Sequence, residues 1–255
     1  MNKSLPPFEI PAAYSPRADL LAGRVILVTG AGQGLGRSVA LACAAHGATT
    51  ALLGSDKDKL AAVYDAIAET SAPEAALIPM DLCTAGDREF ESLAHLVRRD
   101  LKRLDGVVHC ASHFVPLAPL ANQTLEQWLV LLRVNLAAPV ALTRACLPLL
   151  SDASDSSVVF TGETHGAHPA AYWGAFAVAK SALSALATIW SDELEARAVP
   201  RINVLIPGPI SSPQRGRSHP GEDPGRLRTP EEAARAFLFL LGPDSAAISG
   251  RTLEL

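Results

Sequence analysis

Short apolar segments alternate along the chain with longer segments of helical periodicity. Residues 25–28 are β-branched and apolar, as in a strand buried on both faces, whereas Leu35, Val39 and Cys43 recur at every fourth position. Strands are predicted at 25–28, 49–53, 75–80, 106–110, 157–160, 202–206 and 252–255, and helices at 35–47, 56–70, 87–104, 125–150, 172–198 and 231–241. This alternation predicts an α/β fold with one doubly wound parallel sheet of about seven strands and helices on both faces.

No repeat or change in composition interrupts the pattern, so residues 21–255 are expected to form one domain. Residues 1–20 contain four prolines, at positions 6, 7, 11 and 16. They are expected to form an extended arm on the surface of the domain or of a partner subunit.

Composition narrows the classes of partner. The chain has 255 residues, a formal net charge of -4 and a pI of about 6.0, which gives no basic surplus for nucleic acid. The four cysteines lack metal-ligand spacing and are expected to be reduced thiols. No apolar run approaches the ~18 residues of a membrane span, and the N-terminus lacks a signal-peptide pattern. We therefore expect a cytoplasmic protein that binds a small molecule, with no metal, membrane or nucleic acid.

A glycine-rich turn, Thr-Gly-Ala-Gly-Gln-Gly-Leu-Gly at 29–36, joins the first strand to the first helix. Gly30 would permit the tight turn, Gly34 the approach of a pyrophosphate to the backbone, and Gly36 close packing of helix on strand. The free N–H groups of the helix would then face the phosphates. A glycine-rich turn also occurs in ordinary α/β connections, so the turn alone does not establish a phosphate site and the other motifs of the chain are needed.

Further motifs at defined spacings resemble the short-chain dehydrogenase/reductase family over residues 21–255. Asp81-Leu82 matches the acid that meets the adenine amino group, and Cys110-Ala111-Ser112 occupies the family's Asn-Ala-Gly site with two replacements. Asn135 matches the helix asparagine of the catalytic tetrad, and Pro207-Gly208 with Ser212 matches the segment that contacts the nicotinamide carboxamide. The resemblance implies a dinucleotide site formed by Gly30, Gln33, Gly34, Leu35, Gly36, Ser55, Asp81, Leu82, Cys110, Ala111, Lys180, Pro207, Gly208 and Ser212.

The family's catalytic centre is only partly present. Its serine lies thirteen residues before a tyrosine, and its lysine lies four residues after that tyrosine. Lys180 matches the lysine, but Phe176 stands at the tyrosine position and Glu163 at the serine position. A positioned acid contributes about 10²- to 10⁴-fold in rate and an oxyanion donor about 10²- to 10³-fold, so the usual keto–alcohol mechanism is not expected to operate unchanged.

Three kinds of residue are candidates to replace the lost groups. Glu163 is expected near Lys180, where pairing would keep the carboxylate ionised as a base or would simply offset the lysine charge. Tyr172 is expected one helical turn before Phe176, either as a substitute acid or as a solvent-facing residue at the helix start. His165 and His168 can titrate near neutral pH, or can be polar surface.

Cofactor choice is expected to depend on the sequence Gly54-Ser55-Asp56 after the second strand. Gly54 stands where a diol-binding acid would select NAD, which leaves room for a 2′-phosphate. Ser55 stands where family members that prefer NADP usually have arginine, and Asp56 is expected to cap the next helix. The cofactor is therefore expected to be NADP or NAD, with NADP favoured.

Two hypotheses for function follow from the sequence. The first is a dinucleotide-dependent oxidoreductase that transfers hydride between carbonyl and alcohol with weak or altered activity. The alternative is a non-catalytic dinucleotide-binding sensor or scaffold. The substrate is not defined, although Arg215 and Arg217 of the loop 211–228 could draw an anion or be ordinary solvated charges. The apolar helices at 125–150 and 172–198 form a dimer interface in the family, so a homodimer or homotetramer is expected.

Overall fold

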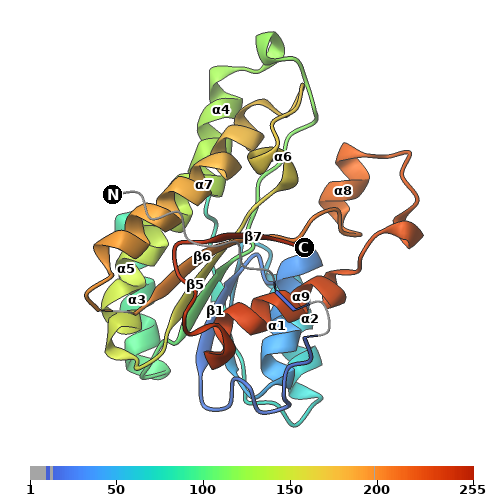
Figure 1. Ribbon diagram of the computed structural model, residues 1–255. Coiled ribbons are helices and arrows are strands. Elements are labelled where there is room, and N and C mark those ends of the chain that lie inside the picture. Colours follow the sequence, from blue (N-terminus) through green and yellow to red (C-terminus); the bar gives the residue numbers. More distant parts are fainter. Residues whose placement is uncertain (1–9, 12–13, 198) are drawn as a thin grey trace.

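A seven-stranded parallel sheet forms the centre of the computed structural model, which describes residues 10–11, 14–197 and 199–255 (Figure 1). The strand order is β3-β2-β1-β4-β5-β6-β7, and every neighbouring pair is parallel. The strands are β1 (Val25–Thr29), β2 (Thr49–Gly54), β3 (Ala76–Pro79), β4 (Gly106–His109), β5 (Ser157–Thr161), β6 (Arg201–Ile206) and β7 (Thr252–Glu254). The predicted α/β class and doubly wound sheet are confirmed.

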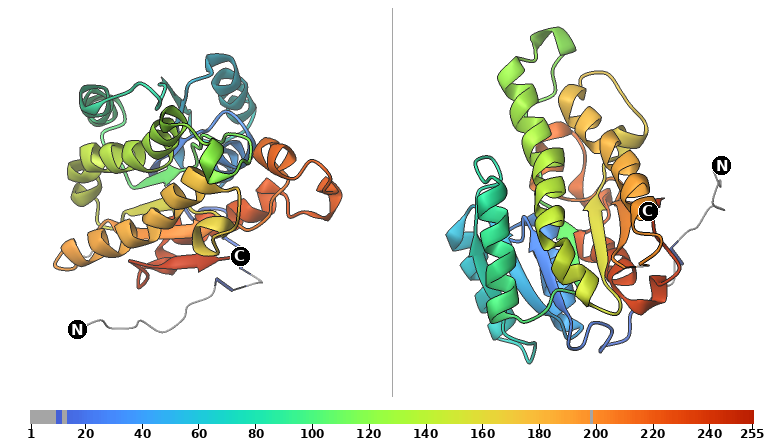
Figure 2. Two further views of the ribbon diagram at one scale, coloured as in Figure 1. Left: turned by 90° about the horizontal axis from the view of Figure 1, so that it is seen from above. Right: turned by 90° about the vertical axis from the view of Figure 1, so that its left-hand side faces the viewer.

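Helices cover both faces of the sheet (Figure 2). They are α1 (Gly34–Ala45), α2 (Lys57–Ala68), α3 (Asp87–Asp100), α4 (Leu125–Leu132), α5 (Ala138–Asp152), α6 (Thr164–Ala167), α7 (Gly174–Glu193), α8 (Pro213–Ser218) and α9 (Pro230–Leu241). A π-helical turn, Arg133–Ala137, joins α4 to α5, and short 3-10 turns lie at Leu120–Asn122, Pro224–Arg226 and Pro243–Ser245.

Several predicted helix bounds need correction. The predicted helix 125–150 is divided by the π turn, and the predicted helix 172–198 begins at Gly174 and ends at Glu193. The predicted helix 87–104 ends at Asp100. Helices α6 and α8 lie in segments predicted as loops, because four and six residues are too few to show helical periodicity.

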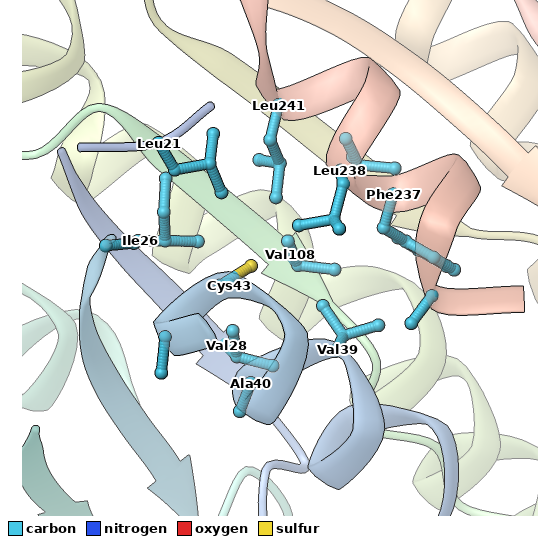
Figure 3. Packing of buried hydrophobic residues seen from close by; sticks show 14 of the residues in the cluster. Leu21, Ile26, Val28, Val39, Ala40, Cys43, Val108, Phe237, Leu238 and Leu241 are labelled. Atoms are coloured by element: carbon cyan, nitrogen blue, oxygen red, sulfur yellow. The ribbon is translucent and has the colours of Figure 1, made fainter. Parts of the chain in front are cut away.

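Buried side chains on both faces explain the apolar character of β1. Ile26 and Val28 pack with residues of α1 and α9, including Val39 and Phe237 (Figure 3). Leu27, between them, faces the opposite layer formed by α3, α5 and α7. Each such fully buried side chain contributes about 1.5–3 kcal/mol, so this one strand ties the two helical layers together.

Only residues 10–11 and 14–20 of the predicted N-terminal arm are described; the rest of it, including Pro6 and Pro7, lies outside the described residues. The Tyr14 hydroxyl donates to the Asp244 carboxylate at 2.8 Å, and the Tyr14 ring packs edge-on against Phe239 at 5.0 Å. Burial, and then the hydrogen bond to Asp244, raise the pKa of Tyr14. This part of the chain therefore lies on the surface of its own domain.

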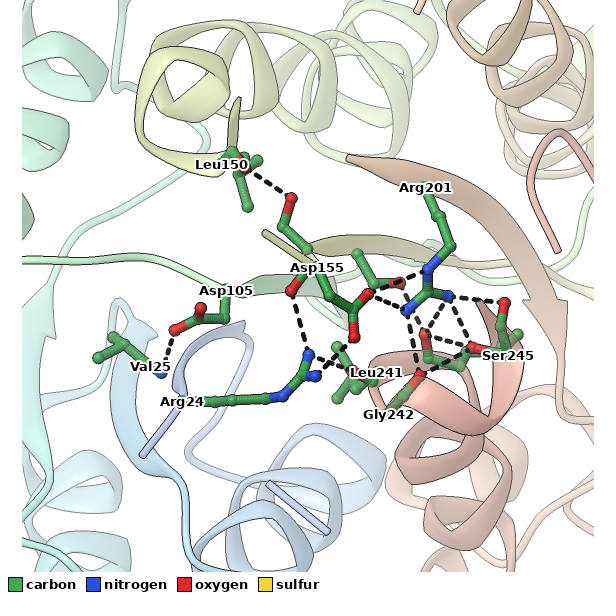
Figure 4. Close-up of polar contacts among 12 residues, drawn as sticks. Arg24, Val25, Asp105, Leu150, Asp155, Arg201, Leu241, Gly242 and Ser245 are labelled. Carbon is green, nitrogen blue, oxygen red and sulfur yellow. Dashed lines mark hydrogen bonds and ion pairs between the residues drawn. The ribbon is translucent and has the colours of Figure 1, made fainter. Parts of the chain in front are cut away.

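A partly buried charge network lies at the amino ends of the strands (Figure 4). Arg24 and Arg201 both pair with Asp155, at 2.5 Å and 3.1 Å. Arg201, which is 2% exposed, also donates to the carbonyls of Leu240 and Gly242. Burial alone would raise the pKa of Asp155, but the hydrogen bond from Arg24 and the charges of both arginines hold it below its ordinary value. One carboxylate thus joins β1, β5, β6 and the end of α9.

Replacing Asp155 by asparagine should destabilise the protein. Asp155→Asn leaves the buried guanidinium of Arg201 without its counter-charge, which should cost roughly 3 kcal/mol in urea unfolding near pH 7. Because the pKa of this carboxyl is depressed in the folded state, its contribution is present above about pH 4 and is lost as the pH falls through the folded pKa. The difference between parent and variant should therefore shrink in acid.

Asp223→Asn is the matched control, because Asp223 pairs with Arg226 on the surface. A loss of stability in Asp155→Asn no greater than in this control would contradict a structural role for the network.

Candidate functional site

A cleft of about 330 Å³ opens at the carboxyl ends of the strands. The strands β1 and β4 are neighbours, and the chain continues from β1 toward one edge of the sheet and from β4 toward the other. A reversal of strand order of this kind is where doubly wound sheets bind ligands. The residues that line the cleft include every one named above for dinucleotide binding: Gly30, Gln33, Gly34, Leu35, Gly36, Ser55, Asp81, Leu82, Cys110, Ala111, Lys180, Pro207, Gly208 and Ser212. Residues predicted from separate motifs are thus brought together in one place.

The glycine turn has the geometry that a phosphate group requires. A Cβ on Gly30 would lie 2.8 Å from the backbone of Ala111, and one on Gly36 would lie 2.2 Å from the carbonyl oxygen of Gly30. Gly34, the first residue of α1, has φ +53, which strains any residue with a side chain. The N-cap residue Gln33 makes no side-chain cap hydrogen bond, and the first turn of α1 contains no acidic residue. The N–H groups of the first turn remain available to an anion, so this turn fits a pyrophosphate.

The far end of the cleft is formed by the ends of β2 and β3. Gly54, Ser55 and Asp81 line it, and the Asp81 carboxylate accepts from the backbone N–H of Cys83 at 2.9 Å. Asp56 is the N-cap of α2 and accepts from the backbone N–H of Lys59 at 3.1 Å. The expected capping role of Asp56 is confirmed, and no carboxylate follows directly after Gly54 at this strand end.

Lys180 lies at the other end of the cleft. It is 6% exposed, and its Nζ donates to the carbonyl oxygen of Thr161 at 2.8 Å. Burial lowers the pKa of Lys180 to about 8, and the nearby charge of Glu163, which favours the ammonium, offsets part of this effect. A direct Glu163–Lys180 ion pair, expected from the sequence, is not formed among the described residues, since no N···O contact within 4.0 Å joins them. The carboxylate therefore acts on the lysine through space.

Phe176 fills the position of the family's tyrosine with a buried hydrocarbon ring. It is 2% exposed and packs edge-on against Phe114, with the ring centroids 5.2 Å apart. The Nζ of Lys180 lies 5.9 Å from its ring centroid. Phe176 has no exchangeable proton, so the phenol's place beside the ammonium has no acid.

Of the two places expected for Tyr172, the structure shows the solvent-facing one before the start of α7 and not that of a substitute acid in the cleft. Tyr172 precedes α7, has φ +75, is 57% exposed and does not line the cleft. The expectation that it shares a helix face with Phe176 is wrong because α7 begins only at Gly174. Gly174 has φ +37, and the amide of Gln123 fills the space beside it, so the chain turns before the helix starts.

Asn135 is buried in the π turn between α4 and α5, behind the cleft surface. Its side-chain oxygen accepts from the Ser112 hydroxyl at 3.0 Å and from the His113 N–H at 3.2 Å. Its amide group donates to the carbonyls of His113 and Leu131. These contacts fix the loop that follows β4, and a π turn is a frequent feature of functional sites.

Cys110, at the position of the family's Asn-Ala-Gly asparagine, carries a neutral thiol. The Thr161 hydroxyl donates to its sulfur at 3.4 Å. Burial raises the pKa of Cys110 to about 11, so the thiol keeps its proton near pH 7. The residue can pack against a ligand, but it does not replace the missing acid.

Helix α8 and the residues around Trp173 form a wall that the sequence did not predict. Trp173, Gln214 and Ser218 line the cleft, and Ser212 caps α8 by accepting from the backbone N–H of Arg215. A proline-, glycine- and arginine-rich segment gave no periodic signal for this wall. His165 stacks on Trp173 at 4.0 Å and His168 approaches Glu254 at 3.6 Å; neither histidine lines the cleft.

Among residues 10–11, 14–197 and 199–255, no group of three or more His, Cys, Asp or Glu side chains could hold a metal ion.

Comparison with known proteins identifies the family. A family model described as short chain dehydrogenase matches residues 24–223. The Escherichia coli K12 protein named "Uncharacterized oxidoreductase YciK" is 36% identical over 241 residues, which cover 94% of this chain and 95% of that protein.

Solved structures agree with this assignment. A short chain dehydrogenase from Salmonella enterica serovar Typhi has a TM-score of 0.92 and 36% identity, covering 94% of this chain and 99% of its own. A Shigella flexneri structure complexed with NADP has a TM-score of 0.90 and 35% identity, covering 93% and 99%. An Escherichia coli CFT073 structure complexed with NADPH has a TM-score of 0.90 and 36% identity, covering 94% and 99%. The chain therefore belongs to the short-chain dehydrogenase/reductase family of oxidoreductases.

Proposed function

We propose that the protein binds NADP(H) in the cleft and transfers hydride between this cofactor and a carbonyl or alcohol substrate, with weak or altered activity. The observation that carries the proposal is the combination of a retained glycine turn and buried Lys180 with Phe176 and Glu163 at the two proton-donor positions. The bound dinucleotide supplies or accepts the hydride, while the chain orients both reactants and handles the proton.

Preference for NADP over NAD is supported by the end of β2. Gly54 places no carboxylate there to bind a ribose diol or to repel a 2′-phosphate. Asp56 is turned toward Lys59, with which it also pairs at 3.2 Å. The related structures from Shigella flexneri and Escherichia coli were complexed with NADP and NADPH.

The proposal of weak activity rests on how protons can move in this site. In carbonyl reduction the hydride reaches the carbonyl carbon, the C=O electron pair moves to oxygen, and that oxygen takes up a proton. Phe176 supplies none, and the Glu163 carboxylate puts negative charge where the oxygen becomes anionic. Lys180 keeps an ammonium in the cleft that can hold ribose hydroxyls, but the phenol through which it would act is missing.

Restoring the donor pair should raise activity. Phe176→Tyr with Glu163→Ser should reduce carbonyl probes with NADPH at least roughly 10²-fold faster than the parent, because a positioned acid and a neutral hydroxyl donor return beside Lys180. Phe176→Tyr alone should gain less, since Glu163 still repels the developing oxyanion. Loss of nicotinamide fluorescence across ketone, aldehyde and quinone probes measures the rates.

Titration of NADPH and NADH against the same proteins separates binding from chemistry. Parent and double variant should bind NADPH equally well, and more tightly than NADH. Tyr172→Phe is the matched control: it removes an exposed phenol outside the cleft and should leave the parent's rate unchanged. If the parent binds neither dinucleotide at millimolar concentration, the proposal fails. If the double variant binds NADPH but reduces none of the carbonyl probes, the alternative of a non-catalytic sensor or scaffold is favoured.

We also propose that the protein is at least a homodimer through the outer faces of α4, α5 and α7. Leu125 and Leu129 on α4 and Val178 and Ile189 on α7 are between 49% and 67% exposed, and α5 continues from α4 through the π turn. The segments Leu125–Asp152 and Gly174–Glu193 are long and apolar enough to cross a membrane by composition, contrary to the expectation from the sequence that no such run exists. Both also contribute side chains to the core, which favours a second copy over a membrane. Cytoplasmic localisation stays a prediction.

The mass in solution tests the interface. Light scattering at micromolar concentration should give at least twice the chain mass, and Ile189→Asp should shift it toward one chain, because a charge would be buried between apolar helices. Leu77→Asp, an exposed leucine on β3, is the matched control and should keep the parent's mass. A parent mass of one chain would refute the dimer.

A further inference from the structure

The substrate end of the cleft combines an apolar wall with several charges. Trp173 and Phe176 present aromatic rings, and Phe114 packs behind them, 5.9 Å and 5.2 Å from their centroids. Glu163, Arg215 and Arg217 line the same cleft. The rings favour a substrate with a flat or hydrophobic body. The charge that such a substrate carries depends on which of the three ionic side chains is free to bind a ligand.

Arg215 is already engaged by a carboxylate of its own loop. Its Nε and Nη2 donate side by side to the two oxygens of Glu222, at 2.5 Å and 2.8 Å. The hydrogen bonds to Glu222 raise the pKa of Arg215, and the charge of Glu163 adds to this effect. A guanidinium held in a bidentate pair has little charge left for a ligand.

Arg217 is placed differently. Its guanidinium lies over the ring of Phe114, 5.7 Å from the centroid. In the part of the chain that the structure describes, this side chain makes no ion pair or hydrogen bond. A cation–π contact uses none of the guanidinium N–H groups as hydrogen-bond donors to protein, so Arg217, an exposed residue at the rim of the cleft, keeps its fork of donors for a ligand.

Two aromatic contacts link this cation to the place of the chemistry. Phe114 supports Arg217 on one side and packs edge-on against Phe176, which lies beside the ammonium of Lys180. Arg217 and Lys180 both line this cleft, so a substrate that meets both would place its anion at Arg217, its carbonyl near Lys180 and its body on the aromatic wall. The Glu163 carboxylate in the same region would repel an anion that lacked its own cation, which makes Arg217 the residue that would decide acceptance.

We propose that Arg217 is a specificity-determining residue that binds the carboxylate of an anionic carbonyl substrate whose apolar body lies against Trp173 and Phe176. This inference rests on the proposed function, because it identifies the substrate class of the same cleft. It makes a hydrophobic keto acid or aldehyde acid the preferred substrate over its neutral counterpart.

A matched pair of probes tests it: 4-formylbenzoate, which carries a carboxylate, and its neutral methyl ester, which has the same ring and aldehyde. Binding to the NADP⁺-saturated full chain is followed by the fluorescence of the tryptophans, since Trp173 lines the cleft. The acid should bind at least about 10-fold more tightly than the ester, as expected for a charge-assisted bidentate contact, and added salt should weaken only the acid.

Variants at Arg217 test whether the preference for the acid comes from this side chain. Arg217→Gln should remove the preference for the acid without changing binding of the ester or of NADPH, and Arg217→Lys should restore part of it. Arg226→Gln, in the same loop but outside the cleft lining, is the matched control and should behave as the parent does.

The outcomes separate this inference from the function on which it rests. Normal NADPH binding without preference for the acid, or with a preference unchanged in Arg217→Gln, overturns the role of Arg217 and leaves the proposed function standing. Failure of the parent to bind NADPH overturns both.

Discussion

The hydrogen bond from the Lys180 ammonium to the Thr161 carbonyl is the contact on which the candidate site depends. It joins the middle of α7 to the end of β5 inside a region where water is largely excluded. Burying a charge is costly unless it is hydrogen-bonded or paired, and among the residues that the structure describes no carboxylate lies in direct contact with this one. The free energy spent on holding the ammonium there is consistent with a functional position. The same contact fixes Phe176, one turn earlier on α7, at the cleft surface.

Binding and proton transfer are carried by separate parts of this fold. The phosphate turn is backbone: its geometry depends on Gly30, Gly34 and Gly36 and on close contact with the loop after β4. The two proton-donor positions lie elsewhere, one at the N-cap of α6 just after β5 and the other on α7, so Glu163 and Phe176 can occupy them without disturbing the turn. This separation explains how a complete dinucleotide cleft can coexist with an incomplete catalytic centre. It also allows α8, the helix that carries Arg217, to vary on its own.

The sequence predicted the features that depend on local chain chemistry. Apolar β-branched runs identified the strands, and the glycine spacing identified the turn, because a buried parallel strand and a positive φ each restrict residue type directly. The sequence did not predict the features whose positions depend on packing between distant segments of the chain. The start of α7, which leaves Tyr172 outside the helix, packs against the amide of Gln123, fifty-one residues before Gly174. The distance between Glu163 and Lys180, and the docking of α8 near Trp173, likewise depend on contacts that a spacing rule does not contain.

The most direct test of the account is the titration of Lys180 itself. Its Nζ is a buried ammonium, and within the described part of the chain neither a phenol nor a carboxylate is in direct contact with it. In protein labelled with ¹³C at the lysine side chains, the Lys180 signal, assigned by its loss in Lys180→Met, should titrate with an inflection near pH 8. An inflection above about pH 10, the ordinary range of a solvated lysine, would contradict a desolvated ammonium and with it the description of the site.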